Sequence, residues 1–187
     1  MAKIPQQAKR VFKGIIFDVY QWPQKMFDGS TETFEALKRS DTAIVIGVTP
    51  EGQILVVEDE QPQRTKVLTF PGGRVNAGEE PLAGAQRELH EETGYASDQW
   101  ELWYSYSASE KIDSTVYYYL ARNIRKTGES HPDPGERIAP RLVSVDQVFE
   151  DIISGKHNAF SLGTHIMRQL LQGKRDELVD FLTNHKN

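Results

Sequence analysis

The stretch GRVNAGEEPLAGAQRELHEETGY, from Gly73 to Tyr95, decides how this 187-residue chain is interpreted. Glycine, glutamate and arginine recur in it at fixed intervals, at Gly73, Glu79, Arg87, Glu88, Glu91, Glu92 and Gly94. If each of these positions had about a 1-in-15 chance of its residue type, a given register would match on the order of once in 10^8 trials. Composition alone therefore does not account for the pattern.

The second half of this stretch predicts an α-helix that begins near Pro81 and ends at Gly94. Proline suits a first helical turn, and glycine suits a left-handed cap at the C-terminal end. At about 100° per residue, Leu82, Ala85 and Leu89 form one stripe that we expect to pack on the core. The adjacent face collects three acidic side chains, Glu88, Glu91 and Glu92.

These glutamates lower the stability of the helix on which they lie. Glu88 and Glu92 are like charges at i and i+4, which costs a few tenths of a kcal/mol in an isolated helix. Glu91 and Glu92 also lie in the last turn, where the helix dipole disfavours anions. A divalent cation would supply the missing counter-charge, and carboxylate oxygens suit Mg²⁺. We interpret this face as a metal site rather than as a solvated acidic surface.

The spacing resembles the signature of the Nudix hydrolases, G-x5-E-x7-R-E-U-x-E-E-x-G-U, in which U is a bulky apolar residue. Every glycine and charged position is met, and Tyr95 stands at the last apolar position. The resemblance implies an α/β fold, the Nudix-type αβα sandwich with a mixed central sheet, an N-terminal β extension and C-terminal helices. It also implies an enzyme that uses Mg²⁺ or Mn²⁺ to cleave a diphosphate linked to another moiety.

The same resemblance assigns metal ligands. The Gly72 carbonyl and the carboxylates of Glu88 and Glu92 are the main ligands that it implies, with Glu91 as a further candidate. Gly73 belongs to the structural part of the motif. Because glycine lacks a Cβ, Gly72 and Gly73 let the backbone come close to the metal.

Orienting and proton-accepting groups complete the expected site. Glu79 is expected to brace the loop against the helix, and Arg87 can orient Glu91 by a charged hydrogen bond at i+4. The candidate bases in the motif are Glu91 and Glu92. In the family the base often lies in a mobile loop, and Glu136 in GESHPDPGERIAPR matches the acidic loop residue of ADP-ribose pyrophosphatases, which this chain resembles. Its rivals in that loop are Glu129, Asp133 and, more weakly, His131.

The first 40 residues are the best indication of the substrate. They resemble the extension of the ADP-ribose and nucleotide-sugar hydrolases, whose extra strands build a dimer and part of the nucleobase pocket. We therefore divide the chain into a β extension (1–40) and a Nudix domain (41–187), and expect a homodimer. The candidate substrate-binding residues are Trp22, Phe34, Arg39 and Arg64. Ordinary core or dimer packing is the alternative role for the aromatic pair.

Composition narrows the remaining possibilities. The net charge of −5 argues against a general nucleic-acid or anionic-membrane surface, and a small nucleotide is the expected partner. The absence of cysteine excludes disulfides and thiolate chemistry. No apolar run is long enough for a signal peptide or a membrane span, so we expect a cytoplasmic protein.

The periodicity and the turn signals predict the remaining elements. We expect strands at 11–20, 33–38, 42–49, 53–58, 67–70, 100–107 and 115–122, with a polar loop before residue 67. From Val145 onward we expect three helices, ending near Ser154, Leu171 and Leu182. Phe160, Gly163, Met167, Leu170 and Leu171 recur at helical spacing, which predicts core packing.

Two other functions are compatible with the sequence. One keeps the chemistry but acts on nucleoside triphosphates, dinucleotides or capped RNA ends. The other is a nucleotide-sensing binding module without turnover. The retained acidic residues argue against this second alternative, because such relatives usually lose them.

Overall fold

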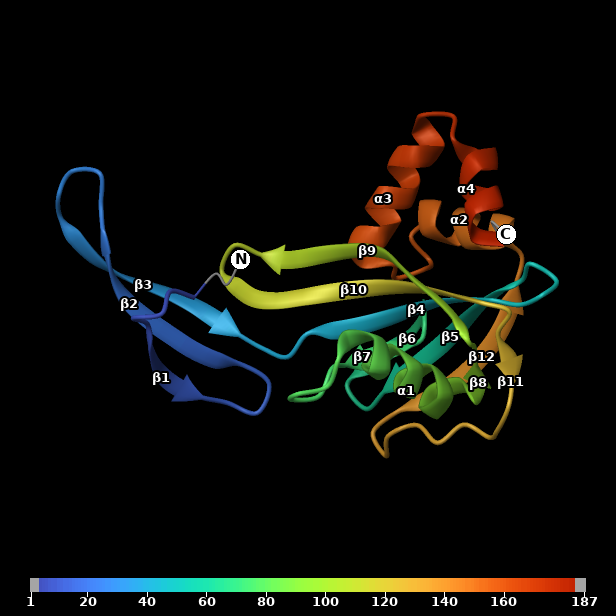
Figure 1. Ribbon diagram of the computed structural model, residues 1–187, viewed down its shortest axis with the longest axis horizontal. Helices are drawn as coiled ribbons and strands as arrows, with labels where there is room; N and C mark the ends of the chain where they lie inside the picture. The colour runs from blue at the N-terminus through green and yellow to red at the C-terminus, as the bar shows by residue number, and fades with distance from the viewer. Residues whose placement is uncertain (1–3, 184–187) are drawn as a thin grey trace.

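A ten-stranded mixed sheet organises the computed structural model, which describes residues 4–183 (Figure 1). The strands are β1 (Lys9–Lys13), β2 (Asp18–Lys25), β3 (Thr31–Lys38), β4 (Thr42–Val48), β5 (Ile54–Gln61), β6 (Arg64–Thr69), β7 (Gly72–Arg74), β8 (Tyr95–Ala96), β9 (Gln99–Ser109), β10 (Ile112–Arg122), β11 (Arg125–Lys126) and β12 (Arg137–Val143). The helices are α1 (Pro81–Thr93), α2 (Val145–Ile153), α3 (Phe160–Leu171) and α4 (Arg175–Thr183). Strands β8 and β11 form a separate two-stranded sheet.

The main sheet runs in the order β1-β2-β3-β10-β4-β5-β12, with β6 beside β5, β7 beside β4 and β9 beside β10. Strand β10 is parallel to β3 and β4 and antiparallel to β9. Helix α1 covers one face, and α2, α3 and α4 cover the other (Figure 1). The arrangement confirms the expected α/β fold, a sandwich of helix, mixed sheet and helix with helices at the C-terminal end.

Strand β4 shows how the sequence specifies both layers. Its segment TAIVIGV is buried almost throughout, as expected for a strand covered on both faces. Ile44 and Ile46 pack with α2–α4, whereas Ala43 and Val45 pack with α1. Side chains alternate across a strand, so one apolar run supplies both cores.

The helix boundaries follow the sequence closely. Helix α1 begins at Pro81, and Gly94 caps it in the left-handed conformation with φ of 72°. Two expected core positions are wrong, because Leu82 is exposed and Leu171 at the end of α3 is 90% exposed. Both lie at helix ends, where the neighbouring layer no longer covers the apolar face. No helix within residues 4–183 is long and apolar enough to cross a membrane.

The strand boundaries differ more from the prediction. Residues 11–20 form parts of two strands, because the chain turns between Gly14 and Phe17. The expected polar loop before residue 67 is largely paired, as the end of β5 and the start of β6. Strand β12 was not predicted, because Pro140 interrupts its pattern. Proline is tolerated at a sheet edge, and β12 is the edge strand beside β5.

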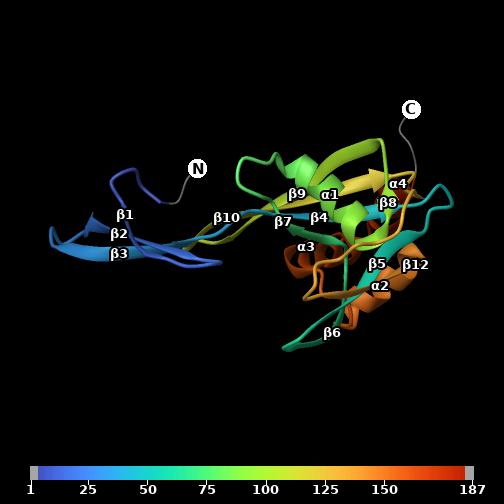
Figure 2. The same ribbon diagram turned by 90° about the horizontal axis from the view of Figure 1, so that it is seen from below.

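Strands β1–β3, which we call the arm (residues 9–38), project away from the rest of the molecule (Figure 2). The arm joins the sheet through two residue pairs between β3 and β10, Leu37 with Ile112 and Lys38 with Asp113. Five large apolar side chains of residues 11–27 are exposed, namely Val11, Phe12, Ile15, Ile16 and Phe27. The arm therefore leaves much of its apolar surface unburied.

Candidate active site

Two glycines bring the β7 backbone against the sheet and the acidic helix. A Cβ on Gly72, which has φ of 151°, would lie 2.4 Å from the carbonyl oxygen of Ala43. A Cβ on Gly73 would lie 2.5 Å from the carboxyl carbon of Glu88. Any side chain at either position would collide, so this approach requires glycine.

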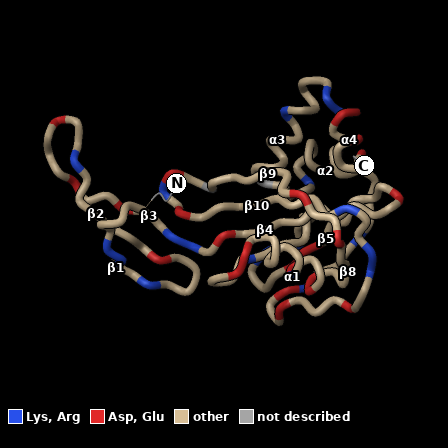
Figure 3. Tube along the Cα trace, viewed as in Figure 1, with Lys and Arg blue, Asp and Glu red and all other residues tan. Residues whose placement is uncertain are grey.

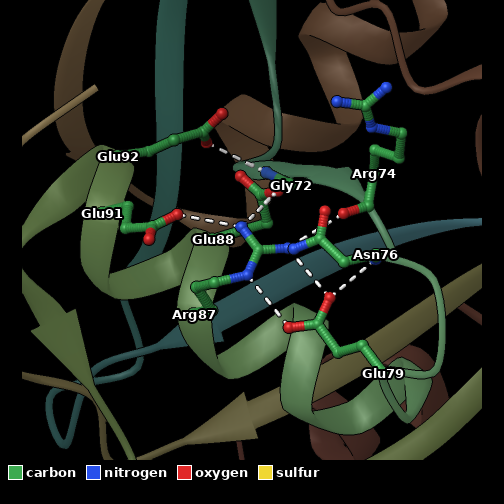
Figure 4. Close-up of polar contacts among 8 residues, drawn as sticks. All are labelled: Gly72, Arg74, Asn76, Glu79, Arg87, Glu88, Glu91 and Glu92. Atoms are coloured by element: carbon green, nitrogen blue, oxygen red, sulfur yellow. Dashed lines mark hydrogen bonds and ion pairs between the residues drawn. The ribbon is translucent and has the colours of Figure 1, made fainter. Parts of the chain in front are cut away.

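Glu92 lies beside the same backbone, on the neighbouring turn of α1 (Figure 4). Its Oε2 accepts a hydrogen bond from Gly72 N at 3.0 Å, and the residue is only 7% exposed. Burial, together with the negative charges of Glu88, Glu136 and Asp59, raises the pKa of Glu92 to about 9. Burial also raises the pKa of Glu88. The site as it stands therefore disfavours the ionised form of both carboxyl groups.

Arg87 ties the acidic residues together (Figure 4). Its Nη1 donates to Glu88 Oε1 at 2.8 Å and to Glu91 Oε2 at 2.9 Å. Its Nε and Nη2 donate to the two carboxylate oxygens of Glu79 at 3.0 and 3.1 Å. Nη2 also donates to the Arg74 carbonyl at 2.9 Å. One guanidinium thus fixes side chains on two turns of α1 and the backbone of β7.

Glu79 connects the loop before α1 to the helix. Besides Arg87, its Oε2 accepts a hydrogen bond from Asn76 N at 2.8 Å. The hydrogen bonds from Arg87 hold the pKa of Glu79 below its ordinary value. These contacts are those that a brace between loop and helix requires, and the role itself stays a prediction.

A cavity of about 240 Å³ opens beside Gly72 and Glu92. Its walls come from β4, β5, β6, β7 and α1 and from the loop before β12, and they include Asp59, Gln61, Arg64, Glu136 and Asn158. Acidic positions gather along α1 and the loops next to it (Figure 3). Arg64 is ion-paired with Asp59. Two predicted residues, Arg64 and Glu136, thus share this cavity with Glu92.

The other predicted substrate residues lie elsewhere in this chain. Arg39 lines a larger cavity, of about 930 Å³, between the arm and residues 75–81. Its Nη2 donates to Thr42 Oγ1 at 3.4 Å, and Thr42 lines the smaller cavity. Trp22 and Phe34 face each other across β2 and β3, with ring centroids 6.1 Å apart, and line neither cavity. Stacking of this pair on a base stays a prediction.

Three acidic or amide side chains of the smaller cavity were not predicted from the sequence, namely Asp59, Gln61 and Asn158. Because the predicted strand ends at residue 58, Asp59 and Gln61 were treated as loop residues. Strand alternation offered a signal, since both share the face of Val57, which also lines the cavity. Asn158 carries no such signal, because it reaches the site through hydrogen bonds with β6.

The donor set suits a hard divalent cation such as Mg²⁺. Glu88 and Glu92 bring carboxylate oxygens to the Gly72–Gly73 backbone, and the burial of Glu92 is not offset by an ion pair with any described residue. Arg87 Nη1 bonds both Glu88 and Glu91, but the side chain of Glu88 is 15% exposed and lies against Gly73, whereas that of Glu91 is 46% exposed. Within residues 4–183, no group of three acidic or histidine side chains is arranged to hold a metal ion. The geometry therefore favours Glu88 and Glu92 over Glu91 as ligands.

An acidic helix packed on a glycine turn at the edge of an αβα sandwich is the arrangement expected of the Nudix class. A family model of the NUDIX domain matches residues 38–162, so the chain belongs to the Nudix family. The chain is 29% identical to the methanol dehydrogenase activator of Bacillus methanolicus over 122 residues, 64% of this chain and 66% of that protein. It is 30% identical to the ADP-ribose pyrophosphatase of Bacillus subtilis strain 168 over 118 residues, 62% of this chain and 64% of that protein.

Two further relatives extend the comparison. The mouse ADP-sugar pyrophosphatase is 37% identical over 82 residues, 37% of this chain and 38% of that protein. A crystal structure of an ADP compounds hydrolase superposes with a TM-score of 0.68, over 91% of this chain and 94% of that one, at 15% identity. This last likeness concerns the fold. The matches to the two bacterial proteins span just under two thirds of those proteins' own lengths.

Proposed function

We propose that this chain is a hydrolase dependent on Mg²⁺ or Mn²⁺ that splits a nucleoside diphosphate linked to another moiety. ADP-ribose or a nucleotide sugar is the proposed substrate, and two phosphate monoesters are the products. Two of the relatives are named for ADP-ribose or ADP-sugar cleavage, which supports this substrate class.

The placement of Glu92 carries the proposal. A buried carboxylate costs free energy unless a cation or several hydrogen bonds accompany it. Glu92 has the Gly72 amide and faces the negative charges of Glu88, Glu136 and Asp59. A divalent cation at this point would offset that cost. The cavity next to it would admit the diphosphate that such a cation binds.

In our proposal, different residues bind the metal, orient its ligands and accept the proton. Glu88, Glu92 and the Gly72 carbonyl would hold the metal, which when bound neutralises the diphosphate and lowers the pKa of a bound water. Arg87 fixes Glu88 against the glycine turn. Glu136 lines the cavity, whereas Glu91 is tied to Arg87, so Glu136 is the better-placed proton acceptor of the two.

Dimerisation and location belong to the same proposal. The exposed apolar side chains of the arm fit a second copy of the chain better than water. A partner arm would then bring Trp22 or Phe34 of the partner subunit toward the substrate. We also propose that the protein acts in the cytoplasm.

Glu92→Gln tests the reaction. With ADP-ribose and Mg²⁺, we expect kcat to fall at least about 100-fold, because the amide loses a charged contact made in the transition state. The matched control is Glu51→Gln, an exposed residue in the turn between β4 and β5. The control should stay within about twofold of the wild type. An unchanged rate for Glu92→Gln would refute the proposal.

A substrate panel separates the alternatives. ADP-ribose, a nucleotide sugar, a nucleoside triphosphate, a dinucleotide and capped RNA would be compared at matched concentration in ¹⁸O-labelled water. The label reports which phosphorus is attacked, and the rates report the substrate. Tight binding of ADP-ribose without product after prolonged incubation with Mn²⁺ would instead indicate a binding module.

A further inference from the structure

The loop that carries the candidate proton acceptor is anchored at both ends. Near its start, Thr127 N donates to the Gly94 carbonyl at 2.8 Å, and His131 N donates to the Glu91 carbonyl at 2.6 Å. These bonds satisfy carbonyls at the end of α1 that have no helical partner. At its other end the loop enters β12, which pairs with β5 from Arg137 onward. The expected mobile loop therefore has a fixed entry and a fixed exit.

The side chain of Glu136 lies among other acids. Burial, followed by the charges of Asp59, Asp133 and Glu88, raises its pKa above the ordinary value. Arg64 is the cation that shares this cavity, but Asp59 pairs with it. An arginine bonded directly to the carboxylate would make Glu136 a weaker base. The guanidinium of Arg64 is paired with Asp59 instead of with Glu136.

Glu136 is held instead by a neutral group. Gln61 Nε2 donates to Glu136 Oε1 at 3.3 Å, from the last residue of β5. A primary amide orients a carboxylate without adding a positive charge. Within residues 4–183, Gln61 is the hydrogen-bond donor to this carboxylate, so Oε2 has no protein donor. The contact joins residues 75 positions apart in the sequence.

We propose that Gln61 is a positioning residue for diphosphate hydrolysis, which holds one oxygen of Glu136 and leaves the other to receive a proton from the attacking water. The water oxygen then bonds to phosphorus, and the P–O bond to the departing phosphate breaks with its electron pair on that phosphate. The water's proton goes to Glu136. This inference rests on the proposed function and extends it to a residue on β5.

Gln61→Met tests the contact, because methionine keeps the length of the side chain and removes the donor. We expect kcat to fall about tenfold, the cost of losing a hydrogen bond to a charged group, with KM within about twofold. Gln63→Met is the matched control, since Gln63 is exposed at the tip of the same hairpin. The control should keep both constants. An unchanged kcat for Gln61→Met would overturn the proposal.

A double-mutant cycle distinguishes positioning from a general structural effect. In a Glu136→Gln background, Gln61→Met should lower kcat by less than about twofold further, because the group to be positioned has already been removed. A full tenfold loss in both backgrounds would overturn the role. Equal thermal unfolding midpoints across the set would show that the fold is intact.

A readout without turnover separates this inference from the proposed function. In the wild type, the side-chain amide resonance of Gln61 should shift when Glu136 is replaced by Gln. If the wild type hydrolyses no diphosphate on the panel but the resonance shifts, the contact is real and the proposed function fails. If hydrolysis occurs and the resonance does not move, the contact with Glu136 is refuted.

Discussion

The Nudix helix and the arm place their side chains by opposite means. Around α1, Arg87 alone connects three glutamates and a backbone carbonyl, and two glycines hold the β7 backbone against the sheet and the acids. The arm meets the sheet at two residue pairs and exposes five of its large apolar side chains. Around α1, the chain's own hydrogen bonds are enough to fix the side chains. In the arm, another molecule would have to supply the contacts that cover the exposed apolar side chains.

This difference agrees with the roles that we propose, catalysis around α1 and recognition of a substrate or a second subunit by the arm. A catalytic group must stay within a fraction of an ångström of its working position, which dense hydrogen bonding achieves. A surface that recognises a substrate or a second subunit can remain incomplete in one chain. We therefore expect substitutions around α1 to affect activity most and substitutions in the arm to affect association.

The largest expected effect comes from Gly73→Ala. The new Cβ would lie within 2.7 Å of the whole Glu88 carboxylate, so that side chain must move. Because a flexible side-chain end can yield, we expect the free energy of unfolding to change by less than about 1 kcal/mol. Activity on ADP-ribose should nevertheless fall about 100-fold, since a proposed metal ligand is displaced.

Kinetics and urea unfolding on the same preparation check this expectation. Gly135→Ala is the control, because nothing lies within 4 Å of a Cβ there and its φ is ordinary. It should leave both measurements close to those of the wild type. Full activity of Gly73→Ala would mean that Glu88 does not work from its present position.

The parts of this region that the sequence predicts are those with local signals. Pro81 and Gly94 fixed the ends of α1. Arg87 and Glu91 met because residues four apart share a helix face. Each of these inferences needed only neighbours in the chain.

The parts that escaped prediction depend on pairing between distant segments. Gln61 reaches Glu136 only because β12 lies beside β5, and Pro140 obscured β12 in the sequence. The sequence predicts two strands in the arm, and the structure has three, because the turn at Gly14 lies within a run of apolar residues. Local propensity does not report which distant strands will pair.

The second prediction concerns His157, which packs beneath the cavity wall. Its ring lies 4.3 Å from that of Phe70, it is nearly buried, and neither ring nitrogen has a partner within residues 4–183. Burial lowers its pKa to about 4, despite the opposing charge of Asp151. The unfolded chain therefore takes up this proton first as the pH falls. The contribution to stability is complete above about pH 6.5 and is lost as the pH approaches about 4.

Urea unfolding of the wild type and of His157→Phe at two pH values measures this contribution. Between about pH 7.5 and about pH 5, the wild type should lose about 2 kcal/mol more than the variant. The comparison removes the contributions of the buried glutamates, which both proteins share. Parallel pH profiles would show that His157 is not buried in its neutral form.

The third prediction tests what the arm lacks. Ile15 is 97% exposed, and together with Phe12 and Ile16 at the same end of the arm it gives an apolar surface that water solvates poorly. If a second copy covers this surface, Ile15→Ser should raise the dimer dissociation constant at least about tenfold, because burying even one isoleucine side chain contributes on the order of 1.5 kcal/mol and a symmetric dimer loses two. Ile153→Ser is the matched control, an exposed isoleucine on α2. Sedimentation over a range of concentrations should show weakened association for Ile15→Ser alone, with equal thermal unfolding of the core.

Equal association for both variants would place the dimer contact elsewhere, and a monomeric wild type would leave the arm to a different partner. A rise in KM that follows the loss of dimer, with kcat unchanged in the saturated enzyme, would show that the arm serves binding while α1 serves the reaction.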